Sequence, residues 1–229
     1  QIDTLVGKIR RVLNRDIPIL VLGETGRAGN FGINGYERDT TPLLAARPDL
    51  ISAGNAWACG TSTAASVPCM FSHLGRAGFD DRPSEFETVL DVVQHAGLAV
   101  LWLDNQAGCK GVCDRVPHAA MDQAACPGGA CPDEAMLDTL QARIAALDPA
   151  RRARGVVVVL HQMGSHGPAY YQRSAPGQKR FLPECTRNAL QDCSREEVVN
   201  AYDNSIVATD RFLGQAIDWL RRNPTGTDN

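Results

Sequence analysis

The sequence lacks several features that would each assign it to a large class of proteins. No window of its 229 residues holds the roughly 18 uninterrupted apolar residues that a membrane-spanning helix needs, so the sequence predicts a soluble chain. Basic residues are not in excess, with 23 Lys and Arg against 26 Asp and Glu, whereas a nucleic-acid-binding domain normally has a basic face. We therefore expect no nucleic-acid partner. The chain begins at Gln1 with neither Met nor a signal peptide, which suggests an excised domain whose targeting segment lies outside this sequence.

The composition is that of an ordinary globular protein, with 44% hydrophobic and 21% charged residues. This length is enough for one large core, so we expect a single domain over residues 1–229. A basic amphipathic helix is predicted over residues 2–15, and we expect it to pack on that core.

Cysteine is the strongest compositional signal. The eight cysteines form four couples that are close in sequence: Cys59 and Cys69, Cys109 and Cys113, Cys126 and Cys131, and Cys185 and Cys193. An even number in loop-like stretches predicts disulfides between neighbours and an oxidising compartment. The spacing of the four cysteines over 109–131 also approximates a structural zinc site, but that alternative leaves the other four unexplained.

Short apolar runs over residues 17–22, 98–103 and 155–160 predict three buried parallel strands. Helices are expected over 85–97 and 132–147, and a capping box at Ser194 and Glu197 begins a long last helix. The excursion over 108–131 is predicted to be an irregular loop. Alternating strands and helices indicate an α/β fold: a mostly parallel sheet flanked by helices, with disulfide-stapled loops.

Polar side chains follow each predicted strand, at the edge where open α/β sheets bind ligands. Glu24 follows the first strand, Asn105 and Gln106 the second, and His161 and His166 the third. A stretch with four hydroxyls, Thr61, Ser62, Thr63 and Ser66, lies between Cys59 and Cys69 and leads into a short helix. A hydroxyl in the first turn of a helix can face a bound phosphate, although Ser and Thr at such positions are commonly N-caps. A carboxylate and a hydroxyl that share a divalent cation would make such a nucleophile reactive.

These residues lie in longer motifs. They are Gly23-Glu24-Thr25-x-Arg27 with Asn34-Gly35-Tyr36, Cys59-Gly60-Thr61-Ser62-Thr63 with Ser66-Val67-Pro68-Cys69-Met70, Asp104-Asn105 with Cys109-Lys110-Gly111, His161-Gln162-Met163-Gly164-Ser165-His166-Gly167-Pro168, and Asn200-Ala201-Tyr202-Asp203-Asn204. In this order they resemble the periplasmic domain of bacterial phosphoethanolamine–lipid A transferases, which include intrinsic and mobile colistin-resistance enzymes. The resemblance implies the alkaline phosphatase or sulfatase-like fold.

The resemblance also implies a reaction and a location. Thr63 would be the nucleophile that takes phosphoethanolamine from phosphatidylethanolamine as a phospho-threonine and passes it to a lipid A phosphate, giving polymyxin resistance. Glu24 and Thr63 would contact zinc, and Asn105, Gln106, Lys110 and His166 would contact the phosphoethanolamine group. The family's disulfides match the four local cysteine couples. A membrane domain preceding this one would hold the enzyme, expected as a monomer, at the periplasmic face of the inner membrane.

The sequence departs from the family pattern after the last helix. There the family has a strand and an Asp-His-Gly-Glu motif with two further zinc ligands, then a substrate-binding His, and residues 1–229 contain none of these. The domain therefore looks incomplete at its C-terminal end. Two other interpretations stay open: another phospho- or sulfo-transferase or hydrolase of the alkaline phosphatase superfamily, and a non-catalytic disulfide-stapled fragment.

The missing ligands lead to a prediction about zinc. A catalytic zinc normally takes three protein ligands and an open position, so Glu24 and Thr63 alone are too few. Isothermal titration of the 229-residue chain with zinc is expected to show weak binding, and a turnover assay to show little activity. Tight one-to-one binding of zinc would contradict this expectation.

Overall fold

The computed structural model describes residues 17–54, 56–82 and 86–223. Within these ranges, four parallel strands form one sheet in the order β1-β4-β2-β3. The strands are β1 (Ile19–Leu22), β2 (Ala99–Asp104), β3 (His118–Ala120) and β4 (Val156–His161). The prediction of a mostly parallel α/β sheet is therefore confirmed. The predicted helix over 2–15 lies outside the described residues.

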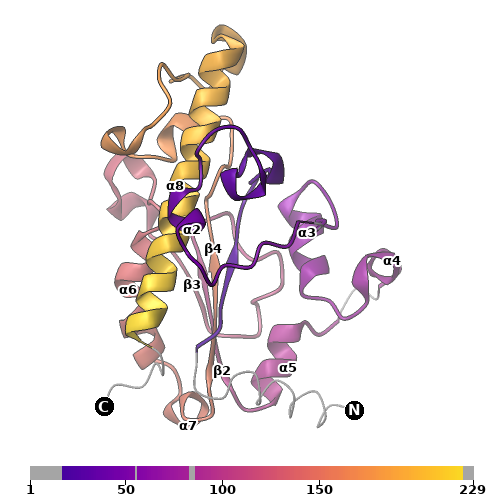
Figure 1. Ribbon diagram of the computed structural model, residues 1–229. Coiled ribbons are helices and arrows are strands. Elements are labelled where there is room, and N and C mark those ends of the chain that lie inside the picture. The colour runs from indigo at the N-terminus through magenta and orange to yellow at the C-terminus, as the bar shows by residue number, and fades with distance from the viewer. Residues whose placement is uncertain (1–16, 55, 83–85, 224–229) are drawn as a thin grey trace.

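Helices cover both faces of the sheet (Figure 1). On one side lie α3 (Thr63–Met70), α4 (Gly75–Phe79) and α5 (Val89–His95). On the other lie α6 (Ala135–Ala145) and the long α8 (Arg195–Arg222), while α7 (Pro149–Arg152) leads into β4 and α2 (Pro42–Ala45) packs on α8. None of the helices in the described ranges is both long and apolar enough to cross a membrane.

The two central strands are buried on both faces, which explains their continuous apolar sequence. Leu101 and Val158 point into a core with Met136 of α6 and Phe212 of α8. The alternate residues, such as Trp102, point into the second core, against α3 and α5.

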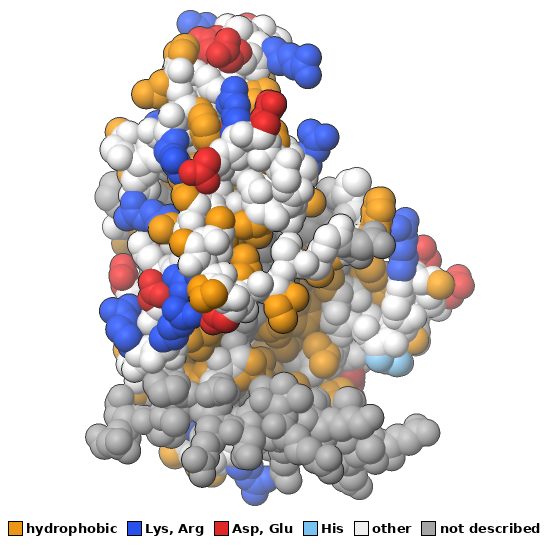
Figure 2. All heavy atoms as spheres, viewed as in Figure 1, with side chains coloured by type: hydrophobic (Ala, Val, Ile, Leu, Met, Phe, Trp, Pro, Cys, Tyr) orange, Lys and Arg blue, Asp and Glu red, His pale blue; other side chains and the backbone are white. Residues whose placement is uncertain are grey.

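On the outer surface, charged side chains of both signs are interspersed over the face shown in Figure 2. Apolar side chains gather on this face between the part of the molecule that contains α8 and the part that contains α4.

Element boundaries differ from the predictions mainly in the excursion over 108–131. This segment was expected to be irregular, but it contains β3, which pairs with the end of β2. Trp102, Leu103 and Asp104 are the register partners of its three residues. So short a strand has too few residues to show an alternating pattern in the sequence.

All eight cysteines form disulfides with their sequence neighbours: Cys59 with Cys69, Cys109 with Cys113, Cys126 with Cys131, and Cys185 with Cys193. The predicted pairing is confirmed, and the alternative of a zinc site at the four cysteines over 109–131 is wrong. Cys109, Cys113 and Asp114 lie close enough to surround an ion. Two sulfurs joined to each other are not thiolates, however, so they are poor metal ligands.

Thiol counting tests this arrangement directly. In denaturant without reductant we expect no free thiol, and after reduction all eight cysteines should react. Four free thiols in the unreduced protein, appearing once a chelator has been added, would instead support the zinc site.

Candidate active site

The carboxyl ends of three neighbouring strands bring together three titratable side chains. Asp104 ends β2, His161 ends β4, and Glu24 follows β1 by two residues. Asp104 Oδ2 lies 3.0 Å from His161 Nδ1, and His161 Nε2 lies 4.0 Å from Glu24 Oε2. Thr63 extends this row, because its Oγ1 donates a hydrogen bond of 2.9 Å to Glu24 Oε2. The structure thus places the two predicted metal-contacting residues, Glu24 and Thr63, in direct contact.

Thr63 is the first residue of α3, and Ser62 is the N-cap that precedes it. The Ser62 hydroxyl accepts a hydrogen bond from the Ala65 backbone N–H. Capping is therefore done by Ser62, and the Thr63 hydroxyl is left to face Glu24. The Cys59–Cys69 disulfide joins the loop before α3 to the last turn of the helix, which constrains the position of Thr63.

Glu24 is held from several sides. Its backbone oxygen accepts the Ser165 N–H at 2.9 Å, and a Cβ at Gly164 would lie only 2.8 Å from the same oxygen. Its Oε1 accepts the Thr25 hydroxyl at 2.7 Å. Thr25 itself has a φ of 54°, a left-handed conformation that is costly for a β-branched residue. Such strain persists where surrounding contacts enforce it, as Tyr202 does here by donating to the Thr25 oxygen at 2.7 Å.

A cavity of about 350 Å³ opens onto this pair. Its walls come from the Glu24 loop, the stretch before α3 and the strand end at His161, and they include Thr61, Ser62, Ser66 and Met70. Backbone N–H groups at the start of α3 have no partner within the helix and favour an anion. The cavity thus combines a hydroxyl, a carboxylate and a helix N-terminus, which is a combination suited to phosphoryl or sulfuryl chemistry.

Asp104 and His161 are functional candidates that sequence reasoning used only as strand ends. Burial alone would raise the pKa of Asp104, but hydrogen bonds from His161 and Trp102 outweigh this effect and lower it to about 2. Backbone N–H groups of Gln106 and Gly108 donate to its other oxygen at 2.9 and 3.0 Å. Asp104 is therefore a fixed carboxylate that orients the imidazole of His161 toward Glu24.

The four predicted substrate-binding residues do not line this cavity. Asn105 is completely buried. Its side chain forms hydrogen bonds of 2.8–3.0 Å with Cys131, Asp133 and Gln123, and it therefore stabilises the loop over 123–133. The Gln106 side chain accepts the Ala107 N–H.

Lys110 and His166 are both exposed. Lys110 donates to the backbone oxygen of Ala107. The backbone oxygen of His166 accepts a hydrogen bond of 2.9 Å from Arg173. Contact of Gln106, Lys110 and His166 with a substrate stays a prediction, and the same contact by Asn105 would require its present hydrogen bonds to break.

Asp133 is a structural residue that the sequence did not reveal. Its carboxylate accepts hydrogen bonds from Asn105, from the Gln162 side chain and from the backbone N–H groups of Met163 and Gly164. These contacts fix the loop that follows β4. Because the partners lie about 30 residues apart in sequence, no local pattern marks this role.

Comparison with known proteins agrees with this geometry. The family model described as Sulfatase matches residues 18–228. The chain belongs to the sulfatase family. It is 44% identical over 216 residues to phosphoethanolamine transferase EptA of Escherichia coli K12, covering 91% of this chain and 38% of the relative. It is 41% identical over 221 residues to phosphatidylethanolamine transferase Mcr-1 of Escherichia coli, covering 92% of this chain and 40% of the relative. The sulfatase-family chain thus spans about two fifths of the length of these relatives.

Solved structures show the same fold. The soluble domain of lipooligosaccharide phosphoethanolamine transferase A from Neisseria meningitidis superposes with a TM-score of 0.80 at 40% identity, over 89% of this chain and 61% of that one. The periplasmic domain of EcEptC from Escherichia coli, crystallised as a complex with Zn, has a TM-score of 0.69 at 21% identity, over 92% and 61% of the two chains.

The donor atoms around the Glu24–Thr63 contact fit a divalent metal in part. Their oxygens lie 2.9 Å apart, so both would be available to one cation, and a carboxylate oxygen is an ordinary zinc ligand. A cation there would replace the hydrogen that Thr63 donates to Glu24. The residues described here offer this pair, with His161 Nε2 4.0 Å from Glu24, as a partial set of ligands.

The depressed pKa of Asp104 predicts acid sensitivity. A shift from 3.8 to about 2 corresponds to about 2 kcal/mol of folding free energy. Because the pKa is lowered in the folded state, this contribution is present above pH ~4 and is lost as the pH falls through ~2. Denaturant unfolding at pH 5 and pH 2 should therefore show a smaller loss of stability in Asp104→Asn than in the wild type. Exposed Asp81→Asn is the matched control, and equal pH dependence in all three proteins would refute the role of Asp104.

Proposed function

We propose that this chain is the nucleophile-bearing part of a phosphoethanolamine transferase that acts on lipid A. The observation that carries the proposal is the hydrogen bond from Thr63 to Glu24 at the start of α3, inside a cavity at the strand ends. The relatives named as phosphoethanolamine transferases support the choice of transferred group.

In the proposed reaction, Thr63 Oγ1 attacks the phosphorus of phosphatidylethanolamine, and Glu24 Oε2 receives the hydroxyl proton. The bond between phosphorus and the diacylglycerol oxygen breaks, and diacylglycerol leaves as an alcohol with the proton that Glu24 received. Phosphoethanolamine is then bound to Thr63. An oxygen of a singly protonated lipid A phosphate attacks the same phosphorus in a second step, the bond between phosphorus and Thr63 Oγ1 breaks, and the proton of that phosphate passes through Glu24 to release Thr63 as the hydroxyl.

Each residue of the row has a separate task in this scheme. Glu24 orients the Thr63 hydroxyl and holds its proton, His161 supports Glu24, and Asp104 fixes the His161 ring. The first N–H groups of α3 stabilise negative charge on the phosphoryl oxygens. When bound by Glu24 and Thr63, zinc would supply further charge stabilisation and lower the pKa of the hydroxyl. Further zinc ligands have to come from residues other than these two.

The proposed product explains a biological effect and a location. Phosphoethanolamine adds an ammonium group to a lipid A phosphate, which weakens the attraction of cationic polymyxins such as colistin. Both lipid substrates require the reaction to take place at a membrane surface. The disulfides indicate an oxidising compartment, and we place the enzyme at the periplasmic face of the bacterial inner membrane, held there by a separate membrane domain and acting as a monomer.

Substitution of Thr63 tests the proposal. In the full-length transferase that contains these residues, Thr63→Ala should abolish transfer from a fluorescent phosphatidylethanolamine, because no nucleophile remains. Thr63→Ser keeps the hydroxyl and should retain measurable transfer. Thr139→Ala, which removes a hydroxyl on α6, is the matched control and should transfer normally. Mass spectrometry of the wild type should find phosphoethanolamine on Thr63.

A sulfatase-like hydrolase is the second candidate, because the matching family model is the sulfatase model. It predicts release of sulfate from aryl sulfates and no ethanolamine-containing adduct.

A non-catalytic fragment is the remaining alternative. It would be favoured if the full-length Thr63→Ala variant showed the same transfer to lipid A and the same polymyxin susceptibility as the wild type.

A further inference from the structure

A second cavity, of about 640 Å³, lies outside the candidate active site. It is enclosed by Arg211 and Gln215 of α8 and by residues within the segments 128–134 and 171–179, and it shares no lining residue with the Glu24–Thr63 cavity. Its volume lies within the range of about 300–1,000 Å³ typical of small-molecule sites. Most of the wall is apolar, with contributions from Ala130, Pro132, Ala175, Pro176 and the ring of Tyr171.

Arg173 lines this cavity with an incompletely paired guanidinium. Its Nε donates to the backbone oxygen of His166 at 2.9 Å. Within the described part of the chain, its two terminal nitrogens have neither a hydrogen bond nor an ion pair. Burial lowers the pKa of this guanidinium, which shows that it is partly removed from water. The Asp133 carboxylate opposes this shift through space, but its oxygens already accept four hydrogen bonds, and it forms no ion pair with Arg173 among the described residues. A partly buried cation with no anion in direct contact is unfavourable, so the cavity favours an anion beside Arg173.

The other charged groups of the cavity are already paired. Lys179 contacts Glu184 and the backbone oxygen of Tyr171, and Arg211 lies 3.5 Å from Glu134. These pairs cancel in charge, so Arg173 is the cation without an ion pair among the described residues that line the cavity. Ser174 lies beside it with a buried hydroxyl that has no hydrogen-bond partner in the described ranges.

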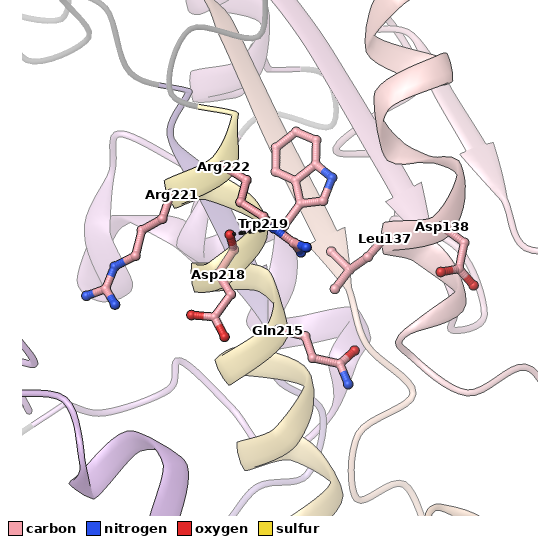
Figure 3. A pocket seen from close by; sticks show the side chains of 7 residues that line it. All are labelled: Leu137, Asp138, Gln215, Asp218, Trp219, Arg221 and Arg222. Atoms are coloured by element: carbon pink, nitrogen blue, oxygen red, sulfur yellow. Dashed lines mark hydrogen bonds between the residues drawn. The ribbon is translucent and has the colours of Figure 1, made fainter.

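The cavity between α6 and α8 in Figure 3 provides a contrast. It has a volume of about 520 Å³, and Asp138 at its edge points away from α8. Two of its charged groups are in ion pairs, Asp218 with Arg47 and Arg221 with Asp49. Within the described ranges, Arg222 donates only to the Asp218 backbone oxygen, as Arg173 does to that of His166, but Arg222 is exposed to solvent. Among the described residues, this cavity therefore holds no partly buried cation that would select an anion.

We propose that the cavity lined by Arg173 binds a phosphate monoester attached to an apolar group, that is, a phosphorylated amphiphile. The Arg173 guanidinium pairs with the phosphate, and the apolar wall contacts the attached group. This site goes beyond the proposed transferase reaction, because its cavity shares no lining residue with the cavity at Thr63 and the phosphate bound in it is not the group transferred.

Isothermal titration of the 229-residue chain with n-octyl phosphate below its critical micelle concentration tests the site. One-site binding is expected, and Arg173→Gln should weaken it by about tenfold or more, because a charge-assisted pair is lost. Arg173→Lys should bind with intermediate affinity. Arg76→Gln on α4, an exposed arginine outside the cavity, should bind like the wild type.

Two further ligands separate the chemical contributions. Neutral n-octyl glucoside should bind more weakly than n-octyl phosphate and should not respond to Arg173→Gln. Inorganic phosphate should also bind more weakly, because it lacks the apolar group. Equal affinity for n-octyl phosphate and n-octyl glucoside, or for n-octyl phosphate and inorganic phosphate, would overturn the proposal of a phosphorylated amphiphile.

Thr63→Ala distinguishes this site from the candidate active site. It should bind n-octyl phosphate like the wild type even though transfer is lost, whereas loss of binding would place the ligand at Thr63 and refute the second site. If circular dichroism shows that Arg173→Gln does not fold, Arg211→Gln tests the same cavity from α8. That variant leaves Glu134 unpaired in the cavity and should also weaken binding, and wild-type affinity in it would count against the site.

Discussion

The register of three parallel strands is the constraint on which the candidate site depends. His161 of β4 is the direct register partner of Asp104 on one side and of Leu22, two residues before Glu24, on the other. A slip of one residue would turn the side chains of β4 to the opposite face and separate the imidazole from both carboxylates. The register is itself fixed by the apolar residues of β2 and β4, which alternate between the two cores. Ordinary core packing therefore sets the geometry of the polar row.

The loops beyond the strand ends have little apolar material, and they are held by covalent and polar contacts instead. The Cys59–Cys69 disulfide constrains the approach to α3, and the Asp133 carboxylate fixes the loop that follows β4. A carboxylate that is partly removed from water is tolerated at such a position when hydrogen bonds satisfy it. The disulfide and the Asp133 hydrogen bonds both restrict the position of these loops. The sheet brings Glu24 and Thr63 near each other, and the loop contacts set the distance between them.

Structural features that depend on contacts between residues close in sequence could be predicted from the sequence. Features that depend on contacts between distant residues could not. Short apolar runs predicted the strands, and cysteine proximity predicted all four disulfides, because both signals lie within a few residues. The family resemblance predicted that Glu24 and Thr63 contact the same zinc ion, and the structure places the two side chains within hydrogen-bond distance of each other. Burial of Asn105 was not predicted, since it depends on Gln123 in the excursion and on Asp133 just after it, and no periodic pattern describes the path of this segment. The position of Arg173 in the wall of a cavity was not predicted either, because the residues that line this cavity come from segments far apart in the sequence.

Helix α8 shows how a structural element reaches the chemistry without contributing a reacting group. An amphipathic pattern explains its packing on the sheet, yet it also buries Asp203 and Asp210. Asp203 binds Asn30, Tyr36 and Arg38, and Asp210 accepts the N–H groups that begin α2. Burial raises the pKa of Asp210 despite these bonds. Tyr202 on the same helix donates a hydrogen bond to the backbone oxygen of Thr25, the residue that follows Glu24. The helix thus anchors the chain that leaves Glu24, and a change in its polar face should reach Thr63 through that carboxylate.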